Sequence, residues 1–403
     1  MPQIKSQILE GSHAIALTVK NIAPDVISAY PITPQTHIVE DLAKFKADGQ
    51  AGYEFLRAES EFAAASIVLG ASAAGSRVYT ATSSQGLLLM TEVVYNIAGM
   101  RLPVVMTCAN RAVSAPINIW NDQQDVHAVS HAGWILLFAE NSQEAVDQHI
   151  LAYKLAEQLR LPVMVNVDGF TMTHTYEPVI IPEAAAIKKY LPAFKPRAGE
   201  FLDPTDPVTL GAFAGPASYM EIREELHKDL RNSLETIEKE YQKFNKIFNQ
   251  KGDPQLEDQR SKIDNGLFEY YGPKKPKTIL VAMGSVIGTI KEAADKINGS
   301  SRFNLLKGGV GVLKIKVFRP LPSSAIIPIL KRAKYIAVID KAIGLGHLGP
   351  LASDLKAAAQ GKIKAKIGSF VVGLGGRDIT EEMIIKIIRE AGKVGDEARF
   401  VGK

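Results

Sequence analysis

The chain has 403 residues, of which 46% are hydrophobic and 22% are charged, a composition typical of a globular protein of about two domains. Its 47 basic and 43 acidic side chains leave a net charge of only +4, and no basic stripe carries interleaved aromatic residues, so nucleic acid is not an expected partner. No apolar run approaches the roughly 18 residues that cross a bilayer, and the N-terminus lacks the plan of a signal peptide. We therefore expect a cytoplasmic protein without membrane contact.

Between residues 26 and 168, apolar strands alternate with helical segments. This pattern predicts an α/β domain with a mainly parallel sheet. The most apolar strands fit a sheet that is covered on both faces. The predicted strands are 26–30, 53–57, 78–81, 104–107 and 162–167, and the predicted helices are 36–46, 60–74 and 85–99.

A long charged stretch, residues 217–249, carries apolar residues at helical spacing. We expect an exposed helix that packs one stripe on a neighbouring element or a partner. A coiled-coil seam is the alternative, although the heptads are irregular.

Glycines and prolines at 250–277 predict a linker. A second α/β unit begins at Thr278, with predicted strands at 278–283, 310–317, 335–340 and 368–373 and a helix at 286–297. The predicted organisation is one domain at 1–249 that ends in the long helix, a linker at 250–277, and a second domain at 278–403.

The segment Tyr30–Thr36 follows the first of these strands and places Thr33 between Pro31 and Pro34. Open α/β sheets bind ligands at the carboxyl ends of their strands. A hydroxyl held there can donate a hydrogen bond to a substrate carboxylate. The alternative is that Thr33 only caps the following helix.

The segment Arg57–Ala65 places Glu61 in the first turn of a helix whose remainder is small and apolar. The helix dipole stabilises a carboxylate there and by itself accounts for a glutamate. A partly buried functional carboxylate would instead share a proton with a ligand nitrogen. Glu59 is the neighbour most easily confused with it.

The segment Thr80–Leu87 brings hydroxyl groups and Gly86 to a third junction between a strand and a helix. Exposed backbone N–H groups at such a junction suit an anion or the edge of an aromatic ring. Helix capping by Ser83 or Ser84 is equally consistent with the sequence.

The segment Asn110–Asp125 is a long polar connection after an apolar strand, and connections of this length are usually functional or disordered. Arg111 at the strand end offers a planar fork for a carboxylate. The alternative is an internal ion pair with Asp122 or Asp125. We favour a functional Arg111.

The single cysteine, Cys108, excludes an intramolecular disulfide. It also excludes an iron–sulfur cluster held by this chain alone, because such clusters need about four thiolates. The eight histidines show no metal-type spacing, so we expect no metal ligands on this chain. The glycine clusters Gly344–His347 and Gly373–Asp378 lack the spacing of a nucleotide-binding loop and predict turns.

Together, the four segments resemble the α-type subunit of 2-oxoacid:ferredoxin oxidoreductases, with the pyruvate-specific subgroup nearest. The resemblance covers nearly the whole chain and implies two layered α/β domains. The first is of the kind that binds the aminopyrimidine of thiamine diphosphate, and the second is like the C-terminal domain of transketolases. The matching residues are Tyr30-Pro31-Ile32-Thr33-Pro34, Glu59-Ser60-Glu61, Thr82–Leu87 and Asn110-Arg111-Ala112, with Val317–Pro322 and Gly373–Asp378 in the second domain.

The resemblance also implies roles for individual residues. In the family, the glutamate that matches Glu61 bonds N1′ of the pyrimidine and promotes activation of the cofactor. Thr33 and Arg111 would hold the carboxylate and carbonyl of a 2-oxoacid, which makes these three the implied catalytic residues. The implied cofactor contacts are Pro31, Thr33, Glu61, Ser84 and Gln85, and the implied substrate pocket comprises Thr33, Arg111, Asn118, Asn121 and Asp122.

The implied reaction is the reversible oxidative decarboxylation of pyruvate with coenzyme A to acetyl-CoA and CO₂, with electrons passed to ferredoxin. The implied partners are a β-type subunit that holds the diphosphate, Mg²⁺ and a [4Fe–4S] cluster, and γ and ferredoxin-like δ subunits or fusions. Thr33, in place of a basic residue, favours a substrate with one carboxylate over oxalate. Branched-chain 2-oxoacids stay an alternative.

Two other classes of protein are consistent with the same fold. A non-redox thiamine-diphosphate component, such as a transketolase or an oxoacid dehydrogenase, predicts a colourless complex without clusters. A non-catalytic scaffold subunit predicts that Glu61 and Arg111 form a structural network. The co-purifying chains and a substrate panel would separate these hypotheses.

Overall fold

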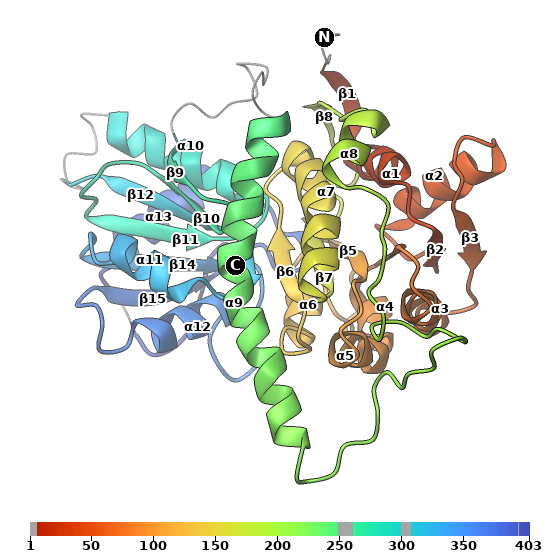
Figure 1. The fold of residues 1–403 in the computed structure, drawn as a ribbon. Coiled ribbons are helices and arrows are strands. Elements are labelled where there is room, and N and C mark those ends of the chain that lie inside the picture. The colour runs from red at the N-terminus through yellow and green to blue at the C-terminus, as the bar shows by residue number, and fades with distance from the viewer. Residues whose placement is uncertain (1–5, 249–260, 300–307, 394) are drawn as a thin grey trace.

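The computed structural model describes residues 6–248, 261–299, 308–393 and 395–403. Two seven-stranded sheets, each accompanied by helices, lie side by side (Figure 1). The main apolar core is continuous across both sheets, and a second cluster packs on the second sheet beneath α10 and α13. The expected class, two layered α/β domains, is confirmed.

The first sheet has six parallel strands in the order β6-β7-β5-β4-β2-β3, with β13 added antiparallel beside β6. Its strands, except the edge strand β3, are buried along most of their length, because helices lie on the sheet as the apolar sequence predicted. The strands are β2 (Val26–Ala29), β3 (Glu54–Arg57), β4 (Val78–Thr82), β5 (Val105–Asn110), β6 (Ile135–Phe138), β7 (Val163–Asp168) and β13 (Val317–Arg319).

The helices of this half include the predicted helices and several that the sequence analysis did not single out. A short ribbon of β1 (Gln7–Glu10) and β8 (Tyr176–Val179) lies beside them. The helices are α1 (Gly11–Ile22), α2 (Thr36–Ala47), α3 (Glu61–Ala73), α4 (Ser84–Leu89), α5 (Thr91–Gly99), α6 (Gln124–Ala128), α7 (Ser142–Leu159), α8 (Ala184–Tyr190) and α9 (Tyr219–Phe248).

The second sheet runs in the order β16-β15-β14-β11-β12-β10-β9, with β9 and β10 antiparallel and the other strands parallel. Its strands are β9 (Ser261–Asp264), β10 (Phe268–Tyr271), β11 (Thr278–Ala282), β12 (Val310–Ile315), β14 (Tyr335–Asp340), β15 (Lys366–Val371) and β16 (Arg399–Phe400). Its helices are α10 (Val286–Gly299), α11 (Ser323–Leu330), α12 (Pro350–Ala359), α13 (Glu381–Glu390) and the 3₁₀ turn η2 (Leu374–Gly376).

The segment expected to be a linker, 250–277, contains two strands. Residues 250–260 lie outside the described part of the chain, but β9 and β10 form a hairpin that pairs with β12. Phe268, Tyr270 and Tyr271 are buried in this hairpin. Gly266 and Gly272 therefore mark turns at the two ends of β10 rather than an unstructured connection.

Two predicted elements are divided. The strand expected at 310–317 breaks at Lys316, so that β12 belongs to the second sheet and β13 to the first. The helix expected at 85–99 is split into α4 and α5 at Met90. Next to this break the Thr91 hydroxyl donates to the Leu88 carbonyl at 2.7 Å, and such side-chain bonds compete with the helical ladder.

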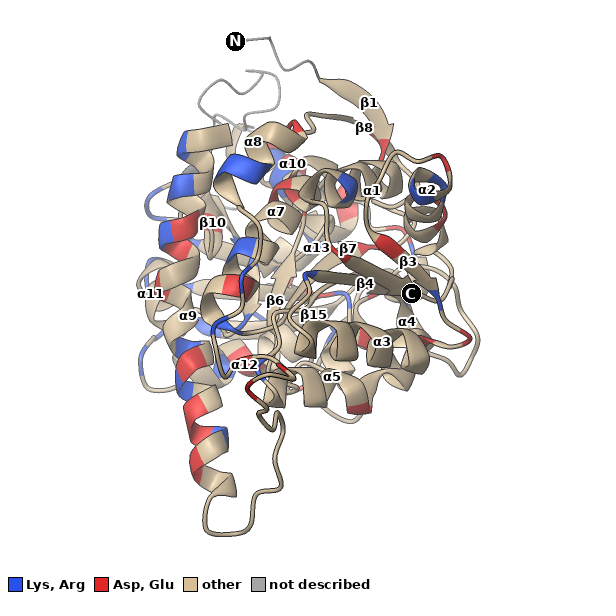
Figure 2. Cartoon of the chain, turned by 45° about the vertical axis from the view of Figure 1, so that its right-hand side comes forward, with Lys and Arg blue, Asp and Glu red and all other residues tan. Residues whose placement is uncertain are grey.

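The long helix α9 packs one stripe on the molecule, as expected. Leu226, Ile237 and Phe244 are buried, and the helix lies against α7. Acidic and basic residues alternate along the helix, and its first turns extend beyond the body of the molecule (Figure 2). Met220 and Ile222 in those turns are exposed.

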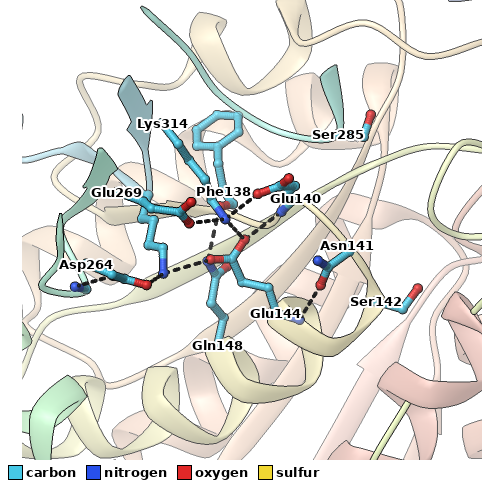
Figure 3. Close-up of polar contacts among 12 residues, drawn as sticks. Phe138, Glu140, Asn141, Ser142, Glu144, Gln148, Asp264, Glu269, Ser285 and Lys314 are labelled. Atoms are coloured by element: carbon cyan, nitrogen blue, oxygen red, sulfur yellow. Dashed lines mark hydrogen bonds and ion pairs between the residues drawn. The ribbon is translucent and has the colours of Figure 1, made fainter. Parts of the chain in front are cut away.

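A buried ionic cluster joins the two domains. Lys314 of β12 lies 2.7 Å from Glu140, 2.8 Å from Glu144 and 3.5 Å from Glu269 (Figure 3). Lys316 adds a second cation, 3.2 Å from Glu144. Burial opposes the charge on Glu144, yet Lys314 and Lys316 together lower its pKa to about 2. Both partners of each pair are needed, because an unpaired charge here would be costly.

Within the described residues, no helix is both long and apolar enough to cross a membrane.

Candidate active site

The four segments singled out in the sequence follow four neighbouring strands of the first sheet. The strands β5, β4, β2 and β3 are adjacent in that order and parallel. Their carboxyl ends therefore lie at one edge, where open α/β sheets bind ligands. The fold thus brings the four segments together.

Glu61 is the first residue of α3 and is 8% exposed. Ser60 caps this helix by accepting a hydrogen bond from the Ala63 N–H at 3.1 Å, so capping does not occupy Glu61. Among the described residues, the Glu61 carboxylate has no hydrogen bond or ion pair. Glu59, by contrast, is exposed. The two neighbouring glutamates therefore stand in different environments.

Gly86 of α4 lies directly against the Glu61 side chain. A Cβ atom at Gly86 would come within 2.8 Å of the Glu61 carboxylate and 2.5 Å of the Thr82 hydroxyl. That hydroxyl is itself buried and has no hydrogen-bond partner in the described chain. Buried polar groups in folded proteins normally have hydrogen-bond partners. This carboxylate and this hydroxyl have none, so together they form a candidate binding site for a polar ligand.

The turn before α2 is held by Gln35, which the sequence analysis did not select. Its amide donates to the Ala81 carbonyl at 2.6 Å and accepts from the Ile32 N–H at 3.3 Å. Thr33 is exposed at this turn, and the N-cap of α2 is Gln35, with no side-chain capping bond. The alternative that Thr33 caps the helix is wrong. Pro31 is also exposed.

Arg111 links two of the segments through backbone oxygen atoms. Its Nη1 donates to the Thr33 carbonyl at 2.9 Å and its Nε to the Asn118 carbonyl at 3.1 Å. The alternative of a side-chain ion pair with Asp122 or Asp125 is not what the structure shows. Because its fork is half-buried and fixed at two points, Arg111 keeps a defined orientation beside Thr33.

Asp125, expected only as a possible ion-pair partner of Arg111, joins three segments at the base of the site. Its carboxylate is fully buried and accepts from the backbone N–H groups of Ser84, at 3.0 Å, and Arg111, at 2.9 Å. Asn110 donates a third bond at 3.0 Å. Burial raises the pKa of Asp125 to about 6, against the opposing effect of these donors.

Ser83 and Ser84 tie α4 to the strand beside it instead of capping α4. The Ser83 hydroxyl donates to the Ala109 carbonyl at 2.7 Å, and that of Ser84 lies 2.5 Å from the Ala112 carbonyl. Ser84 also has φ of +46°, a strained backbone conformation for a residue with a side chain. Gln85, whose Oε1 lies 2.6 Å from the Ser84 hydroxyl, is half-buried at the same junction.

The loop that follows β5 is hydrogen-bonded to a turn of the second domain. Asn118 donates to the Gly375 carbonyl at 3.1 Å, and Asp122 accepts from the Gly375 N–H at 3.2 Å. Gly376 donates to the Asn121 carbonyl at 2.7 Å, and a Cβ atom there would lie 2.3 Å from that of Trp120. The turn at Gly373–Asp378 therefore needs glycine because it approaches this loop closely.

Asn121 and Asp122 are buried rather than open to solvent. Asn121 donates to the Asn110 carbonyl at 3.0 Å, and burial raises the pKa of Asp122. Next to them, Asp168 at the end of β7 binds Lys341 at 3.0 Å and the Ser285 N–H at 2.9 Å. The last two belong to the second domain, and no short motif in the sequence pointed to them.

The comparisons with known proteins agree with this geometry. The family model for pyruvate flavodoxin/ferredoxin oxidoreductase, thiamine diphosphate-binding, matches residues 18–243, and that for pyruvate:ferredoxin oxidoreductase core domain II matches residues 277–384. The chain belongs to the pyruvate flavodoxin/ferredoxin oxidoreductase family. In this family, the four segments fall within the thiamine diphosphate-binding domain, and the turn at Gly373–Asp378 lies in core domain II.

Relatives in the family match along nearly the whole chain. The pyruvate synthase subunit PorA of Methanosarcina barkeri is 43% identical over 97% of this chain and 93% of its own length. That of Methanocaldococcus jannaschii is 42% identical over 97% and 96%. A 2-oxoglutarate:ferredoxin oxidoreductase from Magnetococcus marinus, solved with 2-oxoglutarate, coenzyme A and succinyl-CoA, has a TM-score of 0.70 at 20% identity. It matches 97% of this chain and 66% of its own, and it shows the likeness of fold.

Proposed function

We propose that this chain is the subunit of a pyruvate:ferredoxin oxidoreductase that binds the aminopyrimidine half of thiamine diphosphate. The complex would convert pyruvate and coenzyme A to acetyl-CoA and CO₂, reversibly, and pass the electrons to ferredoxin. The observation that carries the proposal is the buried Glu61 carboxylate, which has no partner within the described chain and lies against Gly86.

The residues present fit the cofactor. A ring nitrogen of the aminopyrimidine needs one buried carboxylate as a hydrogen-bond partner, and Glu61 has that capacity unused. Thr82 offers a second unused polar group, and the absence of a side chain at Gly86 lets α4 approach the Glu61 carboxylate closely. When bound, thiamine diphosphate supplies the electron sink for decarboxylation. Pro31, Ser84 and Gln85 are proposed as the further contacts to the cofactor.

Arg111 and Thr33 are proposed to bind the substrate. Arg111 directs a planar cation to the edge where Thr33 is exposed, and a cation beside a hydroxyl suits the carboxylate and carbonyl of a 2-oxoacid. Asn118 is proposed to line the pocket. Asn121 and Asp122 are proposed to contribute to it by fixing the loop against the second domain.

The remaining parts of the reaction are assigned to partner subunits. Cys108, the single cysteine, is fully buried, so this chain cannot supply the thiolates of a [4Fe–4S] cluster. We propose a β-type subunit with the cluster and the site of the diphosphate and Mg²⁺, and γ and ferredoxin-like δ subunits that complete the path to ferredoxin. Coenzyme A would accept the acetyl group.

The test is a reconstituted complex carrying Glu61→Gln, which keeps the shape of the side chain but not its charge. Pyruvate-dependent reduction of ferredoxin should fall by about 100-fold or more, because acid–base groups of this kind contribute 10²–10⁴ in rate. Glu59→Gln, two residues away and exposed, is the matched control and should keep full activity. Full activity of Glu61→Gln in an assembled, cluster-containing complex would refute the assignment.

A panel of 2-oxoacids tests the substrate. Pyruvate should give the highest kcat/KM. Oxalate should be a poor substrate, because its second carboxylate would need a further cation near Thr33. A preference for branched-chain 2-oxoacids would refute pyruvate as the substrate but would leave the proposed roles of the residues unchanged.

A further inference from the structure

Three side chains that are far apart in the sequence meet beside the candidate active site. Glu10 ends β1, His37 lies in the first turn of α2, and His174 lies between β7 and β8. Each residue offers one atom that can bind a metal, and these three atoms lie within 4.8 Å of one another. Glu10 Oε1 is 2.7 Å from Nδ1 of His37, and the two imidazole rings are 4.5 Å apart.

This set of side chains is one that first-row divalent cations prefer. Imidazole suits Zn²⁺ and its neighbours in the series, and a carboxylate completes many such sites. Three protein ligands leave a further position for water.

The hydrogen bonds around His174 also suit a ligand. The buried Thr173 hydroxyl lies 2.7 Å from Nδ1 of His174 and accepts from the Phe170 N–H at 2.8 Å. A hydroxyl oxygen can accept a second bond, so Nδ1–H of His174 can donate to it. That arrangement leaves Nε2 free for a cation, and such outer-shell partners orient metal-binding histidines in general.

The surroundings are acidic and open to solvent. A cavity of about 380 Å³ is lined by Glu10, His13, His37, Glu40 and Asp41 among others. Three carboxylates face it together with two histidines, and Asp41 is bonded to His13 at 2.7 Å. A divalent cation would enter from this cavity and meet a negative field.

We propose that Glu10, His37 and His174 form a site for a first-row divalent cation, with Zn²⁺ as its representative. Neighbouring ligand atoms around Zn²⁺ are about 3.3 Å apart, so Glu10 and His37 would separate by about 0.6 Å as the cation replaces their hydrogen bond. The site lies outside the residues assigned to thiamine diphosphate and does not depend on that function.

The cation would fix two parts of the active site to each other. Trp120, Phe170, His174 and His37 form a chain of ring contacts, with centroids 4.6, 4.8 and 4.5 Å apart in turn. Trp120 belongs to the loop after β5, and His37 follows the turn that carries Thr33. The cation is therefore a positioning element.

Calorimetric titration of the metal-free full chain with Zn²⁺ tests the proposal. We expect saturable binding of one equivalent per chain and a higher Tm with Zn²⁺, because a ligand that binds only the folded state stabilises it. His37→Ala and His174→Ala should each weaken binding by more than about 100-fold, since loss of an outer-shell partner alone costs 10- to 100-fold.

Two variants serve as matched controls. His13→Ala removes the other histidine of the same cavity, and His347→Ala removes an exposed histidine of the second domain. Both should keep the affinity of the wild-type chain. Loss of binding in His13→Ala together with its retention in His37→Ala would overturn the assignment.

A measurement on the wild-type chain avoids dependence on folded variants. Zn²⁺ should protect His37 and His174 from carbethoxylation by diethyl pyrocarbonate, read out by peptide mass, while His347 stays reactive. Absence of one-equivalent binding, or equal reactivity of all these histidines with and without Zn²⁺, would leave Glu10 and His37 as a simple hydrogen-bonded pair and end the proposal.

Discussion

Two nitrogens of Arg111 donate hydrogen bonds to backbone oxygen atoms, and a substitution at this position would break these bonds. The hydrogen bonds to the carbonyls of Thr33 and Asn118 come from two different nitrogens, so they fix the orientation of the guanidinium plane. An ammonium group is a point charge and cannot reproduce them. The position therefore tests geometry as well as charge.

We predict that Arg111→Lys lowers kcat/KM for pyruvate by about 10- to 100-fold in the reconstituted complex, because one or two charge-assisted hydrogen bonds are worth about 1.5–3 kcal/mol each. The effect should fall mainly on KM if Arg111 binds the substrate carboxylate. Arg57→Lys, at the exposed end of β3, is the control and should change neither constant. An unchanged kcat/KM in Arg111→Lys would contradict the role.

The buried residues that connect the segments of the site by hydrogen bonds are not those that the sequence predicted to be functional. Glu61, Thr33 and Arg111 were selected because a charged or hydroxyl group followed a strand. Gln35 and Asp125 are buried, and their bonds reach segments 46 and 41 residues away along the chain. A residue of this kind cannot be recognised from the local sequence, because its hydrogen-bond partner lies in a distant segment.

At the scale of elements, the approach of α4 to α3 decides the environment of Glu61. Gly86 allows the contact, because any Cβ there would overlap the Thr82 hydroxyl and the Glu61 side chain. Gly70, within α3 itself, has no side chain or other segment of the described chain within 4 Å of the position of its missing Cβ. Glycine is therefore required by packing at position 86 but not at position 70.

We predict that Gly86→Ala displaces Glu61, destabilises the fold by about 1–3 kcal/mol and lowers pyruvate-dependent ferredoxin reduction by about 10-fold or more. Gly70→Ala should keep full activity and stabilise the chain by about 0.5–1 kcal/mol, since alanine replaces glycine in a helix without a clash. Thermal unfolding and the activity of the reconstituted complex measure both. Equal behaviour of the two variants would show that the contact at Gly86 is unimportant.

Most elements were predictable, and the exceptions have local reasons. The strands and helices that were predicted between Val26 and Asp168 lie within a few residues of the observed ones, but β6, α6 and α7 in the same range were not predicted. The strand at 310–317 divides because its two halves pair with different sheets. The hairpin of β9 and β10 was assigned to a linker because its glycines and prolines dominate a short segment.

At the scale of the whole molecule, the ionic cluster around Lys314 makes the junction of the domains sensitive to acid. The pKa of Glu144 lies near 2 instead of 4.5, so its charge stabilises the folded state above about pH 4.5. That contribution is lost as the pH falls from about 4.5 towards 2.

We predict that Glu144→Gln lowers the free energy of unfolding at pH 7 by about 3–5 kcal/mol, because it leaves Lys314 and Lys316 short of a buried partner. Its stability should also decline less steeply than that of the wild type between pH 4.5 and 2. Urea unfolding across this range measures both effects. Glu235→Gln, in an exposed pair with Lys239 on α9, is the control and should match the wild type. A parallel decline in Glu144→Gln would assign the acid sensitivity to other carboxylates.

The sequence by itself determined the class of the fold, the strands that carry the four segments, and the need for other chains to hold any iron–sulfur cluster. These follow from hydrophobic periodicity and from residue counts, which are local or additive properties. Only the tertiary structure decided that Gly86 lies on Glu61, that Gly375 and Gly376 hold the loop after β5, and that Glu10, His37 and His174 meet. Each of these contacts joins segments that are distant in the chain, and the packing of strands and helices, not their spacing in sequence, brings such segments together.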